Sequence, residues 1–94
     1  MGRALLKVKG GKLVKVKLTQ KENKIQKIRI TGDFFLHPEE AIDELEQALV
    51  GKPLKEENLL QTVRNLLHEK NVTLLGVAPK DFVRCVLMAC SENG

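Results

Sequence analysis

The side chains with the most reactive chemistry in this 94-residue chain are two cysteines and two histidines. Cys85 and Cys90 lie five positions apart in a helix-like segment. Five residues turn about 140° further around a helix axis, beyond one full turn, so the two thiols point apart and cannot readily bridge. His37 and His68 are distant from each other, and no serine or cysteine beside them forms a recognisable nucleophile motif. We therefore expect two inert buried thiols, no catalytic residue and no metal site.

Acidic side chains are numerous, but their spacing is typical of a solvated helix surface. They gather just after Pro38, where acids complement the dipole of a helix start, and they are Glu39, Glu40, Asp43, Glu44 and Glu46. The Gly10-Gly11-Lys12 run could suggest a phosphate-binding loop, but strand-like sequence on both sides favours a hairpin turn instead. We expect no cofactor to bind this chain.

The run from Ile30 to Glu40 is the most distinctive stretch of the sequence. Gly32 permits a bend that other residues resist, and Asp33 can fix it by hydrogen bonding to nearby amides. Phe34 and Phe35 are adjacent, so they point to opposite sides if the segment is extended. The favoured interpretation buries both rings within the domain. The alternative leaves one ring at the surface as an aromatic anchor for a partner.

Alternating apolar and polar residues predict antiparallel strands over roughly residues 4–31. A hairpin at Gly10-Gly11 joins the segments 4–9 and 13–18, and a turn at Glu22-Asn23 leads into a third strand over 24–31. The inward positions are Leu6, Val8, Val14, Val16, Leu18, Ile28 and Ile30. The opposite face carries Lys7, Lys9, Lys15, Lys17, Lys27 and Arg29.

The spacing of apolar residues becomes helical after residue 38, and it predicts three helices within about residues 38–90. The first helix opens at Pro38 and stops at Gly51, the second spans about 55–70 with Asn71 as its cap, and the third begins at Pro79. Their apolar stripes are Ala41, Ile42, Leu45, Ala48 and Leu49; Leu59, Leu60, Val63, Leu66 and Leu67; and Phe82, Val83, Val86 and Leu87. Strands followed by helices predict an α+β fold, a three-stranded antiparallel sheet with one face covered by about three helices.

Length and composition indicate one domain over residues 1–94, with 43% hydrophobic residues to build its core. The sequence has no run of 18 apolar residues and no secretory leader pattern near its start, so we expect a cytoplasmic protein without membrane contact. Charge is polarised along the chain. Residues 1–31 carry ten basic and one acidic side chain, whereas residues 32–70 carry four basic and nine acidic ones.

The basic sheet face has two interpretations. Lysines on exposed strands keep sheets from aggregating, so the face can be merely solvated. Alternatively it meets an acidic protein surface or a nucleic acid. Sheets that bind RNA bases stack them on exposed aromatics, and the three predicted strands contain no aromatic residue, so nucleic acid is the less favoured partner.

The Gly32-Asp33-Phe34-Phe35 signature resembles the accessory, C-terminal domain of lipoate-protein ligases. Gly10-Gly11-Lys12-Leu13-Val14-Lys15-Val16 before it and Ala41-Ile42-Asp43-Glu44-Leu45-Glu46 after it extend the resemblance over roughly residues 5–87. In some organisms this domain is a separate small polypeptide. The family's accessory domain is similar in fold to iron–sulfur scaffold proteins, but two cysteines late in one helix do not match the ligands of those scaffolds.

The resemblance implies a non-catalytic accessory subunit that forms a heterodimer with the catalytic subunit of the ligase. That partner would bind ATP, magnesium and lipoate, form lipoyl-AMP, and transfer the lipoyl group to a lysine of an acceptor domain. The acceptor domain is an indirect partner of this chain, and the sequence leaves open whether the two touch. Our hypothesis for the partner interface comprises Gly32, Asp33, Phe34, Phe35, His37, Glu39, Lys15 and Lys17. The alternatives are a small basic module that binds RNA or another polyanion, and a helper of iron–sulfur assembly.

Overall fold

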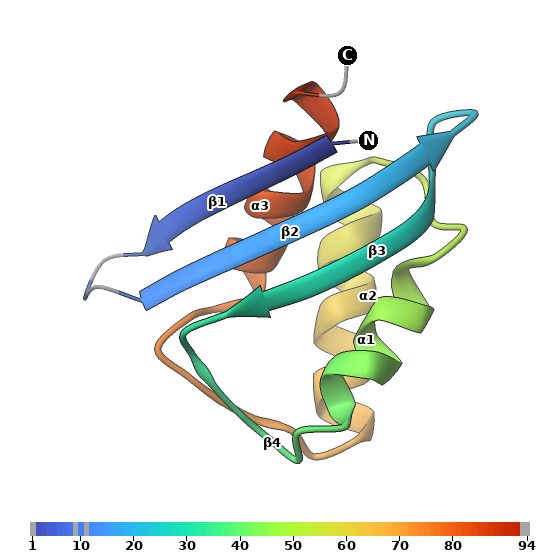
Figure 1. Cartoon of the computed structure of the whole chain (residues 1–94). Coiled ribbons are helices and arrows are strands. Elements are labelled where there is room, and N and C mark those ends of the chain that lie inside the picture. Colours follow the sequence, from blue (N-terminus) through green and yellow to red (C-terminus); the bar gives the residue numbers. More distant parts are fainter. Residues whose placement is uncertain (1, 9, 11, 93–94) are drawn as a thin grey trace.

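A three-stranded antiparallel sheet forms the N-terminal part of the molecule, as the alternation of the sequence predicts (Figure 1). The structure is a computed structural model that describes residues 2–8, 10 and 12–92. The strands lie in the order β1-β2-β3, so β2 is central and β1 and β3 are the edges. Their bounds are β1 Gly2–Val8, β2 Lys12–Lys21 and β3 Lys24–Gly32.

Both predicted hairpin connections are present. Gly10, between β1 and β2, has a φ of +100°, a conformation that glycine adopts without strain. Gly11 and Lys9 lie outside the described residues. Glu22 and Asn23, between β2 and β3, have φ values of 54° and 63°, as expected for a hairpin turn whose twist matches that of the strands.

An irregularity in β3 changes which residues enter the core. The register of β2 and β3 shifts between Thr19 and Gln20, so that Thr19 pairs with Lys27 and Gln20 with Ile25. A bulge of this kind adds one residue to a strand and reverses the alternation beyond it. Ile30 is buried as predicted and Ile28 is half-buried, but Ile25, which strict alternation would place outside, is also fully buried.

Three helices cover the inner face of the sheet and the β3 side of it, and they confirm the predicted α+β fold (Figure 1). They are α1 Ala41–Leu49, α2 Glu56–Glu69 and α3 Pro79–Glu92. Helix α1 begins three residues later than predicted, because Pro38, Glu39 and Glu40 form a turn whose carbonyls accept hydrogen bonds from the amides of residues 41–43. The acids of its first turn are therefore Asp43 and Glu44.

A second, two-stranded antiparallel sheet was not predicted. It pairs β4 (Phe35–His37) with β5 (Thr73–Leu75), segments that are far apart in the sequence. Each strand has only three residues, which are too few for an alternating pattern to be recognised in the sequence. This small sheet connects the bend after β3 to the loop between α2 and α3.

One hydrophobic cluster joins the main sheet to the helices. It includes Val14, Val16 and Leu18 from β2, Leu45 and Leu49 from α1, and Phe82 and Val86 from α3. The edge of β3 is partly covered, because the amide of Ile25 donates to the carbonyl of Lys52 and the amide of Ile30 donates to the Glu46 carboxylate at 2.6 Å. None of the helices in the described part of the chain has the length and apolarity needed to span a bilayer.

Candidate functional site

The bend after β3 depends on a close approach at Gly32. A Cβ atom built there would lie 2.3 Å from the carbonyl oxygen of Leu13 and 2.6 Å from the Phe34 ring. The backbone amide of Asp33 donates to that same carbonyl at 2.9 Å. The sequence-based explanation was therefore incomplete, because glycine is required here for lack of space, and Asp33 contributes to the bend through its backbone.

The two phenylalanines after the bend have different environments. Phe34 is half-buried and meets Phe82 edge to face, with ring centroids 5.2 Å apart. Phe35 is 52% exposed, so the favoured expectation that both rings are buried was wrong. The cause is β4, in which Leu36 occupies the inward position and its two neighbours therefore face outward.

Phe35 does not stand alone at the surface. It is the cross-strand partner of Leu75, which is 59% exposed, and its ring stacks on that of His37 at an interplanar angle of 11°. We term Phe35, His37 and Leu75 the β4–β5 patch. Exposed apolar side chains that adjoin one another are typical of surfaces that bind a partner. Leu75 was missed in the sequence because its outward position follows only from the pairing with β4.

A shallow groove beside the β4–β5 patch gathers most of the predicted interface residues. Its volume is about 350 Å³, and the predicted residues that line it are Gly32, Phe34, Phe35, His37 and Glu39. The rest of the lining is mainly apolar and consists of Ile30, Thr31, Leu36 and Ile42. Asp33 is exposed on the same bend but does not line the groove.

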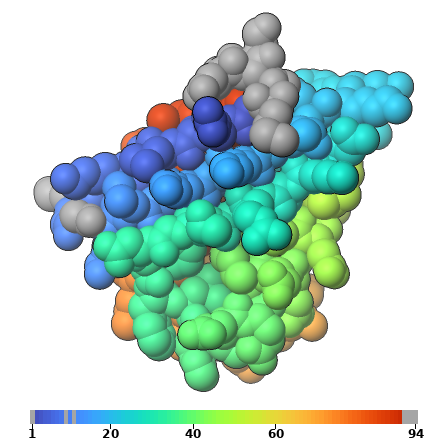
Figure 2. Space-filling model, viewed as in Figure 1, coloured from blue at the N-terminus to red at the C-terminus, as the bar shows by residue number. Residues whose placement is uncertain are grey.

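Lys15 and Lys17 lie on a different surface, the outer face of the main sheet. Figure 2 shows this face across the upper part of the molecule, with β4 and α1 below it. Both lysines are exposed, and they line a groove with Arg3 and Leu5. Lys7, Lys27 and Arg29 are also exposed as predicted, whereas Lys9 lies outside the described residues.

The two cysteines are free, and their thiols contact different parts of the sheet. The Cys85 sulfur is buried and lies 3.5 Å from the carbonyl oxygen of Val14, as a weak donor. Burial raises the pKa of the Cys85 thiol to about 11, which disfavours the reactive thiolate. Cys90 was expected to be buried as well, but it is only half-buried, and its thiol donates to the side-chain oxygen of Gln20 at 3.2 Å. Among the described residues, no three His, Cys, Asp or Glu side chains gather as a set of metal ligands.

Comparison with known proteins gives consistent results for sequence and structure. A family model described as the bacterial lipoate protein ligase C-terminus matches residues 6–86. Lipoate-protein ligase A subunit 2 of Thermoplasma acidophilum is 36% identical over 74 residues, which are 79% of this chain and 76% of that protein. A chain from the structural analysis of an archaeal lipoylation system, a bipartite lipoate protein ligase and its E2 lipoyl domain from the same organism, aligns with a TM-score of 0.78 and 33% identity. That alignment covers 89% of this chain and 91% of the archaeal one.

Proposed function

This chain belongs to the family of the bacterial lipoate protein ligase C-terminus, and we propose that it is the non-catalytic accessory subunit of a bipartite lipoate-protein ligase. The observation that carries the proposal is the similarity to subunit 2 of the Thermoplasma ligase over most of both chains. In this proposal residues 1–94 act as one accessory domain in a heterodimer with the catalytic subunit. ATP, magnesium and lipoate bind to that partner, which forms lipoyl-AMP. The proposed setting is the cytoplasm, where thiols such as those of Cys85 and Cys90 stay reduced.

The interface that we propose for the catalytic subunit is centred on the β4–β5 patch. Lys15 and Lys17, which the hypothesis from the sequence included, line a different groove and are left out of this interface. The exposed parts of the bend, Gly32, Asp33 and Glu39, surround it. Phe34 contacts Phe82 inside the domain and lines the groove that adjoins the patch. An aromatic side chain that can be fully desolvated by a partner contributes more to binding than most of its neighbours. A stable heterodimer would bury roughly 1,200–2,000 Å² in total, so contacts must extend beyond the patch itself.

Accessory binding can activate the catalytic subunit only through a difference in affinity between two of its states. We propose that this chain binds the conformation with complete ATP and lipoate sites more tightly than the open one. Each tenfold preference requires about 1.4 kcal/mol of differential contact energy. A bend whose backbone is held by the hydrogen bond from Asp33 to Leu13 suits this role, because little backbone entropy is lost when it docks.

Association is the first test. The purified chain and the catalytic subunit of the same organism are mixed and analysed by size-exclusion chromatography with light scattering. We expect one complex with one copy of each chain. Separate elution of the two chains at micromolar concentration, with both folded by circular dichroism, would contradict the proposed heterodimer.

A further inference from the structure

A row of three cations crosses the outer face of the main sheet. Lys17 of the central strand pairs directly with Arg3 of β1 on one side and with Arg29 of β3 on the other. Like charges directly opposite each other destabilise a sheet, so this arrangement costs stability. We term the surrounding exposed side chains the basic face; they are Arg3, Leu5, Lys7, Lys15, Lys17, Lys27 and Arg29.

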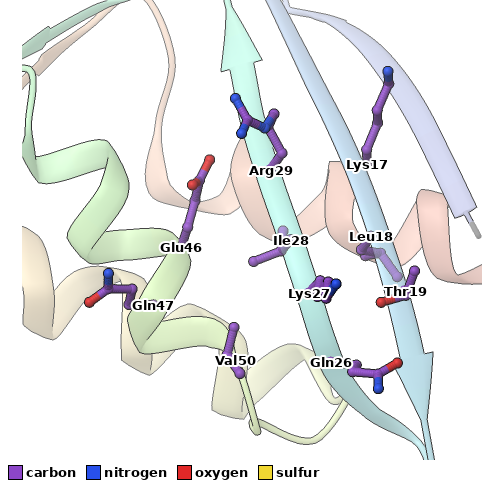
Figure 3. A pocket seen from close by; sticks show the side chains of 10 residues that line it. All are labelled: Lys17, Leu18, Thr19, Gln26, Lys27, Ile28, Arg29, Glu46, Gln47 and Val50. Atoms are coloured by element: carbon purple, nitrogen blue, oxygen red, sulfur yellow. The ribbon is translucent and has the colours of Figure 1, made fainter.

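The described acidic side chains do not neutralise this row. The one salt bridge among the described residues joins Lys70 to Glu44, away from the basic face. Figure 3 shows Glu46 on α1 near Arg29, with Lys17 beside Arg29 on the neighbouring strand. However, the Glu46 carboxylate accepts the amide hydrogen of Ile30 at 2.6 Å, and it forms no salt bridge with Arg29.

Protection of strand edges does not explain the pattern. Lysines guard against aggregation where a strand has unpaired backbone groups, that is, at the edge of a sheet. Lys15 and Lys17 lie on β2, which is paired on both sides. A solvated face could equally carry threonine or glutamate at these positions, and glutamate at position 17 would form favourable pairs with Arg3 and Arg29. The uniform positive charge therefore points to an acidic partner.

An apolar side chain within the basic face, on the edge strand β1, favours a protein as that partner. Leu5 is 50% exposed and lines a groove of about 460 Å³ together with Arg3, Lys15 and Lys17. An apolar contact surrounded by charges is the usual anatomy of a protein interface. The three strands offer no aromatic ring on which a base could stack, which disfavours a single-stranded nucleic acid.

We propose that the basic face docks a carboxylate-rich surface of the acceptor domain that receives the lipoyl group. This inference rests on the proposed function, in which the ligase must hold a permanent subunit and a transient protein substrate. The two exposed surfaces have the different properties that these two contacts require. The apolar β4–β5 patch suits lasting contact, whereas a charged face accelerates encounter and allows release.

The test uses the complex of this chain with the catalytic subunit and an unlipoylated E2 lipoyl domain as acceptor. Lys15→Glu/Lys17→Glu is compared with Lys55→Glu/Arg64→Glu, which changes the net charge equally at exposed positions on or beside α2. We expect the first variant to raise the KM for the acceptor at least tenfold at low salt, with kcat and lipoyl-AMP formation changed less than twofold. The difference from wild type should shrink in 0.5 M salt, since the contact is electrostatic.

Each other outcome overturns the inference. An unchanged KM for the acceptor removes the basic face from acceptor binding while lipoyl-AMP formation still supports the proposed function. Loss of the heterodimer or of lipoyl-AMP formation assigns the face to the catalytic subunit instead. If generic RNA at equal concentration displaces the acceptor from wild type but not from the variant, the basic face binds nucleic acid instead. Lys15→Gln/Lys17→Gln provides the same readout if the charge reversal does not fold, with a smaller rise in KM.

Discussion

Phe35 lies directly opposite Leu75 in the two-stranded sheet, and both side chains are more than half exposed. Exposed cross-strand partners of this size form one continuous apolar surface, because opposite residues have Cβ atoms only about 5 Å apart. The pairing brings together residues that are 40 positions apart in the sequence. In the proposed heterodimer this surface is the part that the catalytic subunit covers.

Phe35→Ala tests this role of the β4–β5 patch. Because the ring is exposed, the free energy of unfolding should change by less than about 1 kcal/mol. The Kd for the catalytic subunit should rise at least tenfold, which corresponds to about 1.4 kcal/mol. Titration calorimetry measures the Kd, and Met88→Ala is the matched control, since Met88 is 40% exposed on α3. Equal affinity of Phe35→Ala and wild type would remove the patch from the interface.

Gly32→Ala tests the geometry of the bend. The new Cβ would collide with the carbonyl of Leu13 and the Phe34 ring, so we expect a loss of roughly 2 kcal/mol or more in unfolding free energy. Gly51→Ala is the contrast, because nothing lies within 4 Å of its Cβ position and only its φ of +85° resists the change. It should cost about 1 kcal/mol. Urea denaturation compares the two variants. A smaller loss of unfolding free energy for Gly32→Ala than for Gly51→Ala would contradict the close approach at Gly32.

Most of the fold followed from periodicity, because its long elements each show several repeats of one pattern. The alternation of Val14, Val16 and Leu18 and the helical stripes each contain enough residues to identify one buried face. The burial of Ile25 could not be predicted, because it depends on a bulge set by the pairing of β2 with β3. Short strands such as β4 and β5 likewise could not be predicted, because only their pairing with each other defines them as strands.

The candidate site was predictable in location but not in detail. The Gly32–Glu39 run identified the bend, and the alternation identified the basic strand face. Which of the two phenylalanines faces solvent depends on the register of β4, and the position of Leu75 beside Phe35 follows only from the pairing of β4 with β5. The cation row likewise emerges only when the register places Arg3 and Arg29 on either side of Lys17.

Lys17→Glu should stabilise the isolated chain. The substitution replaces two repulsive cross-strand pairs with two attractive ones, to Arg3 and Arg29. We expect an increase of about 0.5–1 kcal/mol in unfolding free energy, or roughly 2–8 °C in Tm. Lys27→Glu is the control, since Lys27 faces Thr19 and not a cation. Calorimetric melting at low salt measures both, and a Tm for Lys17→Glu below that of wild type would contradict the cation row.

Stability should fall at alkaline pH because of Cys85. Burial raises the pKa of its thiol from 9.0 to about 11, so between these values the folded chain holds a proton that the unfolded chain releases. The contribution is fully present below pH 9, declines by about 1.4 kcal/mol per pH unit between pH 9 and about 11, and is lost above that. Urea denaturation across this range should show a steeper loss in wild type than in Cys85→Ala. The same pH dependence of the unfolding free energy in wild type and in Cys85→Ala would contradict a protonated, buried thiol.

The most direct test of the central claim is the rate of lipoyl-AMP formation by the catalytic subunit as this chain is titrated in. We predict little activity without the chain and a rise that saturates at one equivalent, with Phe35→Ala shifting the curve to higher concentration. Full activity of the catalytic subunit alone, unchanged by any amount of this chain, would contradict the account.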